Sequence, residues 1–391
     1  MVATLRRRWR LLAIVAALGL LVLIVIGVAA ISWVFSSKLL DPDHELGPYG
    51  IAVERVEVRD LPAGGADLRV TFERDETSAR PGIYGLDFPD GHAIAREIVA
   101  TTDDEVTRLV TDVRGDLEEG GEVAFDERVW EGNPHATRDV PYREIDFRSE
   151  LGPMPAWQVD GRGDTWAIFV HGHNITRHEG LRVLPTLRRA GLPTLLIAYR
   201  NDPGAPESED GLIHLGETEW RDLESAARRA IRDGARSFVL LGDSMGGAIV
   251  SQFVHESPLA ARVRALILDA PVLDWGAVLD LQADERGLPT LLATTTEWAV
   301  SLRIGFDWSA FDQVARAREF HMPILLFHGT EDSTVPISSS DAFARALPEL
   351  VTYHRVARAG HVESWNVGPA RYERRVRAFL ASAVRRVRPG G

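Results

Sequence analysis

One short stretch restricts the fold of this chain more than any other. Residues 238–241 are apolar and β-forming, a Gly-x-Ser-x-Gly motif follows at 242–246, and a helical pattern begins directly afterwards. Such a strand-to-helix elbow holds its serine in a strained conformation, and the flanking glycines leave room for the neighbouring strand and helix. The pattern predicts that Ser244 is a nucleophile at the end of a buried strand. The N–H of Met245, at a helix N-terminus, would then face a substrate oxyanion.

A Gly-x-Ser-x-Gly match also occurs in ordinary turns, so its surroundings decide its meaning. A serine hydroxyl needs a histidine to take its proton, and the histidine needs a carboxylate to fix its tautomer and stabilise its charged form. Residues 323–329 have the pattern of a buried strand, and the polar loop after them contains Asp332. A last strand over 351–356 leads into a loop with His361. We therefore expect Asp332 as the acid and His361 as the base.

Four motifs in this order resemble the α/β-hydrolase family. Besides the elbow, His-Gly-x-x-Asp-x-x-Val-Pro at 328–336 resembles the segment with the family's acid, and Gly-His at 360–361 resembles the segment with its base. The resemblance covers about residues 165–385. It implies an α/β fold with a mostly parallel sheet and helices on both faces.

The fourth motif is an oxyanion loop. A buried strand at 166–170 ends in His-Gly-His-Asn at 171–174, which looks like the loop that carries an oxyanion donor in the family. The resemblance implies that the backbone N–H of His173 is the second oxyanion donor, beside that of Met245.

The resemblance also implies the reaction. The chain is similar to bacterial membrane-anchored serine hydrolases of the serine aminopeptidase and lysophospholipase branch. Such an enzyme cleaves an ester, thioester or amide through a Ser-His-Asp triad and a covalent acyl-enzyme. Serine at position 244 disfavours the related dehalogenases and epoxide hydrolases, which use an aspartate nucleophile. The alternative is a catalytically silent binding or scaffold protein that has kept the fold.

Two carboxylates next to these motifs leave questions open. Asp269 ends the strand after the elbow helix, where some members of the family carry their acid, so it is the alternative to Asp332. Asp243 directly precedes the nucleophile, and the sequence assigns it no role.

A metal site is a further alternative, because His171, His173 and His178 resemble the ligands of zinc hydrolases. No aspartate completes that cluster, and the chain has no cysteine, so we expect neither a metal nor a cofactor. His171 is instead expected to support the oxyanion loop.

Composition excludes several other classes. Without cysteine there is no thiol nucleophile or disulfide. Lys38 is the one lysine and follows the apolar N-terminal segment, which excludes Schiff-base enzymes, phosphate-binding Gly-Lys-Thr loops and serine–lysine dyads. With 44 basic and 57 acidic residues, the chain is not expected to bind nucleic acid.

The N-terminus predicts a membrane anchor. Residues 11–35 form an apolar run without a charge, long enough to cross a bilayer as a helix. Four arginines in the basic tail 1–10 precede this run, and acidic residues follow it. The positive-inside rule then predicts a single-pass protein of the cell membrane, with a cytoplasmic N-terminus and an extracytoplasmic catalytic domain. The alternative is a signal peptide cleaved after the Val-Ala-Ala at 28–30, although the run exceeds the usual signal core. In either case a chain starting near Asp41 should be soluble and active.

The remaining chain predicts two domains. Alternating segments such as 53–58 and 68–72 indicate a small β-rich accessory domain over 41–155, and the hydrolase domain follows over 156–391. An apolar insertion at 272–322 is either a cap over the site or a pair of helices packed on the sheet. The expected substrate is a small-molecule or lipid-like acyl compound, and the sequence leaves its chain length and the oligomeric state open.

Overall fold

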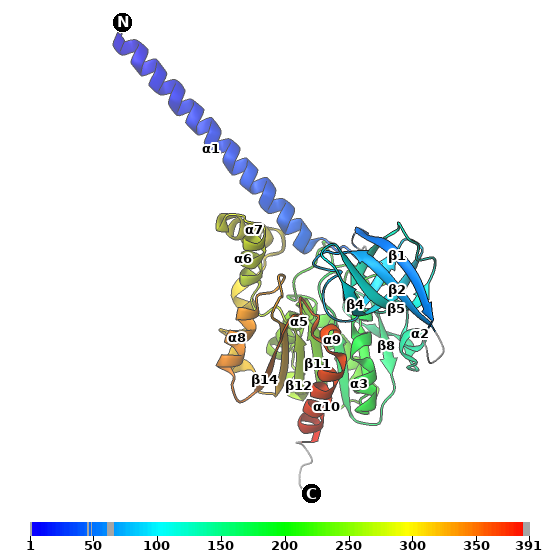
Figure 1. Ribbon diagram of the computed structural model, residues 1–391. Helices are drawn as coiled ribbons and strands as arrows, with labels where there is room; N and C mark the ends of the chain where they lie inside the picture. Colours follow the sequence, from blue (N-terminus) through cyan, green and yellow to red (C-terminus); the bar gives the residue numbers. More distant parts are fainter. Residues whose placement is uncertain (1, 45–46, 48, 61–65, 386–391) are drawn as a thin grey trace.

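The structure is a computed structural model, and it describes residues 2–44, 47, 49–60 and 66–385. A long N-terminal helix leads into a body that combines a closed six-stranded barrel with an eight-stranded sheet covered by helices. The N-terminal helix enters the body between the barrel and a pair of helices, α6 and α7 (Figure 1).

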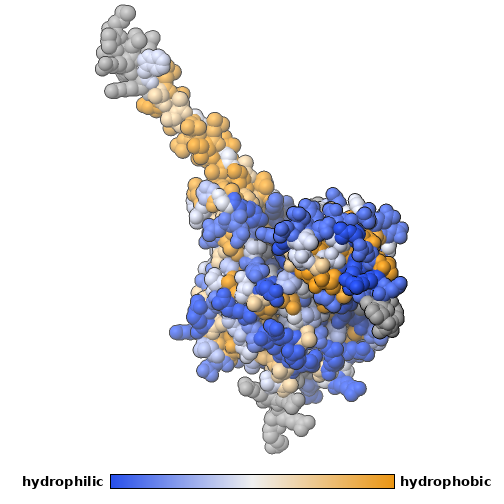
Figure 2. All heavy atoms as spheres, viewed as in Figure 1, coloured by the Kyte–Doolittle hydropathy of each residue, from blue (hydrophilic) through white to orange (hydrophobic). Residues whose placement is uncertain are grey.

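Helix α1 (Val2–Leu40) is longer than the predicted span of residues 11–35 and includes the segment expected as a tail. The apolar span Leu11–Leu40 is 30 residues long, and its most apolar stretch is not buried against the body. Among the described residues it is the one helix long and apolar enough to cross a membrane. Apolar surface covers the helix down to the body (Figure 2).

The barrel closes in the order β1-β2-β5-β4-β3-β6, with antiparallel pairing throughout. Its alternating sequence pattern arises because one face of each strand points into a small apolar core that includes Phe72 and Leu86. The strands are β1 (Ile51–Asp60), β2 (Ala66–Glu73), β3 (Tyr84–Phe88), β4 (Gly91–Thr101), β5 (Glu105–Arg114) and β6 (Glu122–Asp126), followed by the short helix α2 (Pro134–Arg138).

The large sheet has the order β14-β13-β12-β11-β9-β10-β8-β7. Its central strands pair in parallel, which confirms the predicted α/β fold with a mostly parallel sheet. The strands are β7 (Arg143–Arg148), β8 (Pro153–Val159), β9 (Thr165–Val170), β10 (Thr194–Ile197), β11 (Ser237–Asp243), β12 (Val263–Asp269), β13 (Ile324–Gly329) and β14 (Val351–Val356).

The expected domain boundary between residues 155 and 156 is wrong. Strands β7 and β8 form an antiparallel hairpin at the edge of the large sheet, so the chain enters this sheet at Arg143. Strand β7, at the edge of the sheet, alternates polar residues with Ile145 and Phe147, as the barrel strands do. Its sequence pattern therefore does not mark the change from one sheet to the other.

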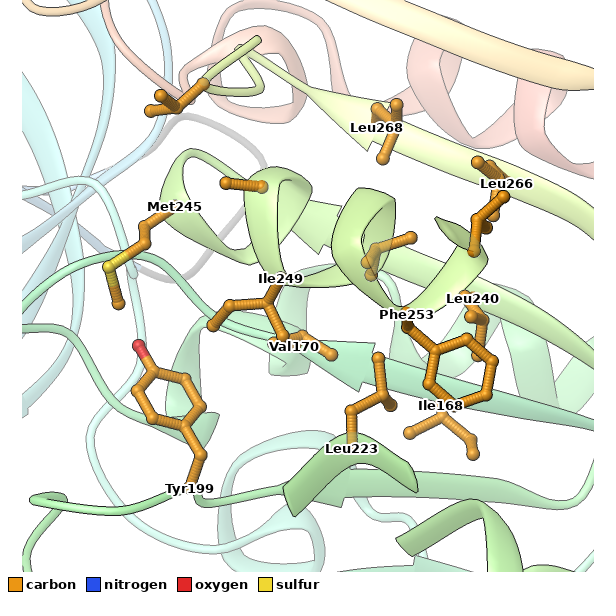
Figure 3. Packing of buried hydrophobic residues seen from close by; sticks show 14 of the residues in the cluster. Ile168, Val170, Tyr199, Leu223, Leu240, Met245, Ile249, Phe253, Leu266 and Leu268 are labelled. Carbon is orange, nitrogen blue, oxygen red and sulfur yellow. The ribbon is translucent and has the colours of Figure 1, made fainter. Parts of the chain in front are cut away.

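Apolar side chains cover both faces of the large sheet. Along β11, Phe238 and Leu240 belong to one core cluster, whereas Val239 and Leu241 belong to the other, because successive side chains point to opposite faces. Figure 3 shows the first cluster, in which Ile249 and Phe253 of the elbow helix pack over the strands. The covering helices are η1 (Arg177–Arg182), α3 (Leu184–Arg189), α4 (Trp220–Arg232), α5 (Met245–Glu256), η2 (Ala260–Arg262), α8 (Ile337–Ala346), α9 (Ser364–Val367) and α10 (Pro369–Arg385).

The insertion between β12 and β13 is helical. It contains α6 (Trp275–Glu285), α7 (Thr290–Ile304), η3 (Trp308–Phe311) and η4 (Ala317–Glu319). Helices α6 and α7 lie beside the last turns of α1, at the end of the sheet where the strands of a parallel sheet carry their functional loops (Figure 1).

Candidate active site

Ser244 occupies the turn between β11 and α5 with φ 51° and ψ −121°, a strained conformation for a residue with a side chain. The two glycines of the motif are required by close contacts. A Cβ at Gly242 would lie 2.5 Å from the carbonyl oxygen of Gly246, and a Cβ at Gly246 would lie 2.2 Å from the carbonyl oxygen of Val170. The sequence from 242 to 246 thus folds as the predicted elbow.

The structure brings Ser244, His361 and Asp332 into one hydrogen-bonded chain. His361 Nε2 lies 2.8 Å from Ser244 Oγ, and His361 Nδ1 donates to Asp332 Oδ2 at 2.8 Å. The other carboxylate oxygen, Oδ1, accepts the N–H groups of Thr334 and Val335 at 2.8 and 2.9 Å. The Asp332 carboxylate is therefore fixed by its own loop while it orients the imidazole.

The charged groups of Asp332 and His361 stabilise each other. Burial alone would raise the pKa of Asp332, but His361 and His328 hold it well below its ordinary value. Burial would lower the pKa of His361, and the Asp332 carboxylate more than compensates, so the pKa of His361 is raised. His328 lies under the acid, with its Nε2 3.2 Å from Asp332 Oδ2 and its Nδ1 2.7 Å from Ser340 Oγ.

The loop after β9 passes directly beside the nucleophile. A Cβ at Gly172 would lie 3.1 Å from Ser244 Cβ, and His173 and Ser244 line the same cavity. Met245 is the first residue of α5, so its N–H has no intrahelical acceptor. Both expected oxyanion donors thus belong to segments that flank Ser244.

His171 supports this loop. Its Nδ1 donates to the carbonyl oxygen of Gly172 at 2.9 Å, its Nε2 donates to Asp202 at 2.8 Å, and its ring stacks on Tyr199 at 4.3 Å. The carboxylate of Glu179 accepts the N–H of Gly172 at 2.9 Å.

The alternative of a three-histidine metal cluster is wrong. His171 is paired with Asp202, whereas His173 Nε2 donates to the carbonyl oxygen of Leu39 at 2.8 Å and His178 Nδ1 lies 2.7 Å from Thr176 Oγ1. The three rings therefore point to three separate partners.

Among the described residues, one set of side chains has metal-ligand spacing. It consists of Asp87, His92 and Glu131, in and beside the barrel. Both ring nitrogens of His92 are already hydrogen-bonded, to Asp87 at 2.6 Å and to the carbonyl oxygen of Val129 at 3.1 Å. The imidazole thus offers no free ligand atom.

The two remaining carboxylates have other partners. Asp269 is buried and accepts the hydroxyl of Ser364 at 2.7 Å, and burial raises its pKa to about 6. Asp243 forms a buried ion pair with Arg182, whose Nη2 lies 3.2 Å from Asp243 Oδ2. Burial, together with Glu179, still raises the pKa of Asp243 well above its ordinary value.

Arg182 is a residue that the sequence analysis missed. Its Nη2 pairs with Glu179 at 3.1 Å as well as with Asp243, and its Nη1 donates to the carbonyl oxygen of Val362 at 2.8 Å. One guanidinium thus joins the residue before the nucleophile to the residue after His361. The only sequence signal is the spacing of Glu179 and Arg182, three residues apart on one turn.

A cavity of about 230 Å³ opens beside Ser244. Its wall is formed by the end of α1, helices α6 and α7 of the insertion, the loop after β9 and the loop that carries Asp332. Its apolar lining residues are Phe35, Leu39, Val272, Trp275, Val278, Leu279, Ala283, Leu288, Leu292, Ala293 and Val335, and its polar ones are Lys38, His173, Ser244, Gln282, Arg286, Thr296 and Thr334.

The end of α1 is attached to the site. The last carbonyl groups of a helix have no intrahelical partner, and here His173 Nε2 donates to the carbonyl oxygen of Leu39 and the N–H of Ile213 donates to that of Leu40 at 2.7 Å. Leu40 itself is fully buried in the core of the large sheet. Burial lowers the pKa of His173, which favours the neutral imidazole with its proton on Nε2.

Comparisons with known proteins fit this geometry. Residues 208–385 match the prolyl oligopeptidase family, and residues 57–126 match a domain of unknown function, DUF8805. No curated protein matches the chain.

Solved structures share the fold. An esterase of Pyrococcus furiosus is 17% identical with a TM-score of 0.52, and the alignment covers 65% of this chain and 97% of the esterase. DcsB, solved with a substrate analogue, is 16% identical with a TM-score of 0.50, over 63% of this chain and all of DcsB (100%). The sheet, the elbow and the prolyl oligopeptidase match together show that the chain belongs to the α/β-hydrolase family and is a hydrolase of that kind.

Proposed function

We propose that this protein is a membrane-anchored serine hydrolase that cleaves an ester, thioester or amide through Ser244. The observation that carries the proposal is the hydrogen-bonded chain from Ser244 through His361 to Asp332, with both distances at 2.8 Å, at the tip of a strained elbow. Activation of a serine requires this order of nucleophile, base and orienting acid.

In the first half of the reaction, Ser244 Oγ attacks the substrate carbonyl while His361 Nε2 takes the hydroxyl proton. The negative charge that develops on the carbonyl oxygen is stabilised by the N–H groups of Met245 and His173. His361 then gives its proton to the leaving group, and the acyl group remains on Ser244. In the second half, a water molecule gives a proton to His361 and attacks the acyl carbonyl. The bond between the acyl carbon and Ser244 Oγ then breaks, Oγ takes the proton back from His361, and the acid is released.

The insertion at 272–322 acts as a cap in this proposal. Of its two interpretations, a cap is favoured because Trp275, Leu279 and Leu292 line the cavity beside Ser244. The apolar wall suits the acyl part of a substrate, because removal of apolar surface from water contributes about 25 cal/mol per Å².

Helix α1 is the proposed anchor. Its apolar window of 30 residues exceeds the roughly 20 residues needed to cross the hydrocarbon core. The arginines at positions 6, 7, 8 and 10 favour a cytoplasmic N-terminus and an extracytoplasmic catalytic domain. A mature chain that begins near Ile31 would instead identify the helix as a cleaved signal sequence.

Labelling with a fluorophosphonate tests the proposal, because this probe reacts with an activated serine. We expect the full-length chain to be labelled and the Ser244→Ala variant to be unlabelled, with kcat for a short ester reduced by roughly 10⁴ to 10⁶. Equal melting temperatures of the two proteins provide the control for folding. A wild-type chain that is neither labelled nor active would favour the alternative of a silent scaffold.

A further inference from the structure

The identity of the substrate is suggested by what surrounds the cavity. Phe35 and Leu39 of α1, Leu288 just before α7 and Leu292 in its first turn line it together with Ser244. The anchor is thus one wall of the site, and the cavity lies where the membrane helix meets the insertion.

Helix α7 is attached along the end of α1. Ser32 Oγ lies 2.7 Å from Thr295 Oγ1, and Arg303 donates to the hydroxyls of Ser36 and Ser37 at 3.1 and 3.0 Å. The guanidinium of Arg303 also lies 4.8 Å from the ring centre of Trp33. These contacts hold α7 at a fixed place next to the membrane helix.

The outer face of α7 is apolar and has no partner in the part of the chain that the structure describes. Leu291, Trp298 and Leu302 have 60%, 69% and 83% of their surface exposed. They are separated by seven and then four residues, so they form one stripe along the helix. On that helix Thr295, the contact with α1, borders the stripe. The exposed apolar surface of α7 therefore continues that of α1.

The length of α1 indicates how deep the stripe of Leu291, Trp298 and Leu302 lies in the bilayer. About 20 residues cross the hydrocarbon core, whereas the apolar window Leu11–Leu40 has 30 residues. The last third of the window therefore reaches the interface between lipid tails and head groups. Trp33 lies in this part, and Trp298 lies on α7 beside it; tryptophan is enriched at this depth in membrane proteins.

The charge of the cavity wall is opposite to that of the whole chain. The chain has a net charge of −13, yet the cavity is lined by two cations, Lys38 and Arg286, and by no carboxylate. Both side chains are exposed, and neither has an ion-pair partner among the residues that the structure describes. Arg286 donates only to Gln282, at 2.9 Å to its carbonyl oxygen and 2.5 Å to Oε1. An anionic group at the mouth of the cavity would find two free donors.

We infer that the substrate is an acyl ester of a phosphate-bearing membrane lipid, which enters the cavity from the bilayer between α1 and α7. The acyl chain lies along the apolar wall, Lys38 and Arg286 receive the phosphate, and the ester carbonyl reaches Ser244. The stripe of Leu291, Trp298 and Leu302 keeps the entrance in contact with the lipid. This inference rests on the proposed hydrolase function and adds its substrate class.

Recognition of the phosphate group is tested with two lipids that differ only in that group, 1-oleoyl lysophosphatidic acid and 1-oleoylglycerol. The full-length chain is placed in vesicles of ether-linked phosphatidylcholine, which it cannot hydrolyse. We expect kcat/KM to favour the phosphate-bearing lipid, and Lys38→Gln and Arg286→Gln each to reduce this preference by roughly tenfold, the usual loss for a charge-assisted hydrogen bond. Arg236→Gln is the matched control, since Arg236 is exposed and does not line the cavity.

The entrance is tested with a triple variant, L291S/W298S/L302S. We expect the ratio of lysophosphatidic acid turnover in vesicles to turnover of water-soluble p-nitrophenyl butyrate to fall by roughly tenfold or more, because the apolar contact with the membrane is lost. The control is V58S/V99S/V113S, which replaces three exposed valines of the barrel and should leave the ratio unchanged.

The outcomes separate this inference from the function on which it rests. Turnover of p-nitrophenyl butyrate without turnover of either oleoyl lipid would overturn the lipid inference and leave the serine hydrolase in place. If the protein turns over neither the water-soluble ester nor the lipids, the proposed hydrolase function itself is overturned. Equal turnover of the two oleoyl lipids, unaffected by Lys38→Gln, would overturn the role of the phosphate, and an unchanged ratio in the α7 variant would overturn the entrance.

Discussion

At the scale of single residues, geometry separates the two carboxylates between which the sequence left a choice. Asp332 accepts a hydrogen bond from His361 Nδ1 at 2.8 Å, whereas Asp269 accepts one from the hydroxyl of Ser364 at 2.7 Å. We expect Asp332→Asn to lower kcat by roughly 10³ to 10⁴, because an amide holds the wrong tautomer of the histidine. Asp269→Asn should retain most of the rate. Steady-state kinetics of purified variants with matched melting temperatures measures both, and the reverse order of the two losses would contradict the assignment.

The pH dependence of the reaction follows from the interaction between His361 and Asp332. His361 acts as a base only when neutral, and the Asp332 carboxylate raises its pKa against the effect of burial. The pH profile of kcat/KM for a short ester is therefore expected to have its acid limb above pH ~6.5, the ordinary pKa of histidine.

Removal of the negative charge in Asp332→Asn leaves burial as the main influence, so the pKa of His361 falls. The acid limb of the variant should then move to lower pH. A pH profile of kcat/KM for both proteins measures this shift. An acid limb that stays in place would show that Asp332 does not set the pKa of the base.

The candidate site could be predicted where each residue lies in a local motif. Ser244, Asp332 and His361 each follow a recognisable strand, and the loop around each has its own signature. Asp243 has no such signature, because its partner Arg182 is 61 residues away and only the folded chain brings the two together. Contacts of this kind depend on packing between elements, which a single sequence does not encode locally.

At the scale of elements, Arg182 connects the segments that carry Ser244 and His361. Arg182→Gln would leave the buried carboxylates of Glu179 and Asp243 without their cation. We expect a loss of roughly 3 to 5 kcal/mol in the free energy of unfolding, the usual effect of removing one partner of a buried ion pair. Urea-induced unfolding of the two proteins measures the difference.

A surface pair provides the control for this prediction. Arg228 pairs with Glu224 one turn away on α4, and its side chain is 52% exposed. Arg228→Gln should cost less than about 1 kcal/mol, because water screens an exposed pair. Equal losses in the two variants would mean that the buried network around Arg182 has no special role in stability.

The type and place of a strand or helix could be predicted where the period of its apolar residues was clear. The central strands β9, β11, β12 and β13 are continuous apolar runs, and α4 and α10 have an apolar face, so their sequence patterns predicted both type and place. The sheet to which a strand belongs was less evident. Strand β7 alternates like the barrel strands, and the closure of the barrel depends on pairing between β1 and β6 over a distance of about seventy residues.

At the scale of the whole molecule, helix α1 and the candidate site share residues. A chain starting at Asp41 would lack Phe35, Lys38 and Leu39 of the cavity wall and the buried Leu40. The sequence alone predicts a soluble and active protein. Given these contacts, we instead expect a soluble chain with a lower melting temperature and kcat/KM for a short ester reduced by roughly tenfold or more, since a wall of the site is lost and His173 loses its acceptor.

A chain starting at Ile31 is the matched comparison, because it lacks most of the apolar helix but keeps the residues that contact the site. It should retain the melting temperature and the short-ester activity of the full-length chain in detergent. Thermal unfolding and ester kinetics of the three proteins decide the matter, and equal behaviour of the two shortened chains would contradict a role of residues 31–40 in the site.

The barrel is connected to the candidate site through an ion pair and hydrogen bonds. Arg80 forms an ion pair with Glu363 at 2.8 Å, and Glu363 accepts the N–H of Gly360 at 2.7 Å, next to His361. Asn366 donates to the carbonyl oxygen of Ile83 at 2.7 Å. The barrel therefore packs against the loop that carries the base, instead of serving only as a spacer.

In the proposed membrane-anchored enzyme, the continuity of α1 into the body determines where the reaction takes place. A catalytic domain on a flexible tether samples a volume that grows with the length of the tether, whereas here the helix runs into the core at Leu40 with no intervening linker. Ser244 is then held at one height above the bilayer and in one orientation to it. The reaction becomes two-dimensional: its rate should follow the mole fraction of substrate within the enzyme's own leaflet, and dilution of the whole suspension should leave it unchanged.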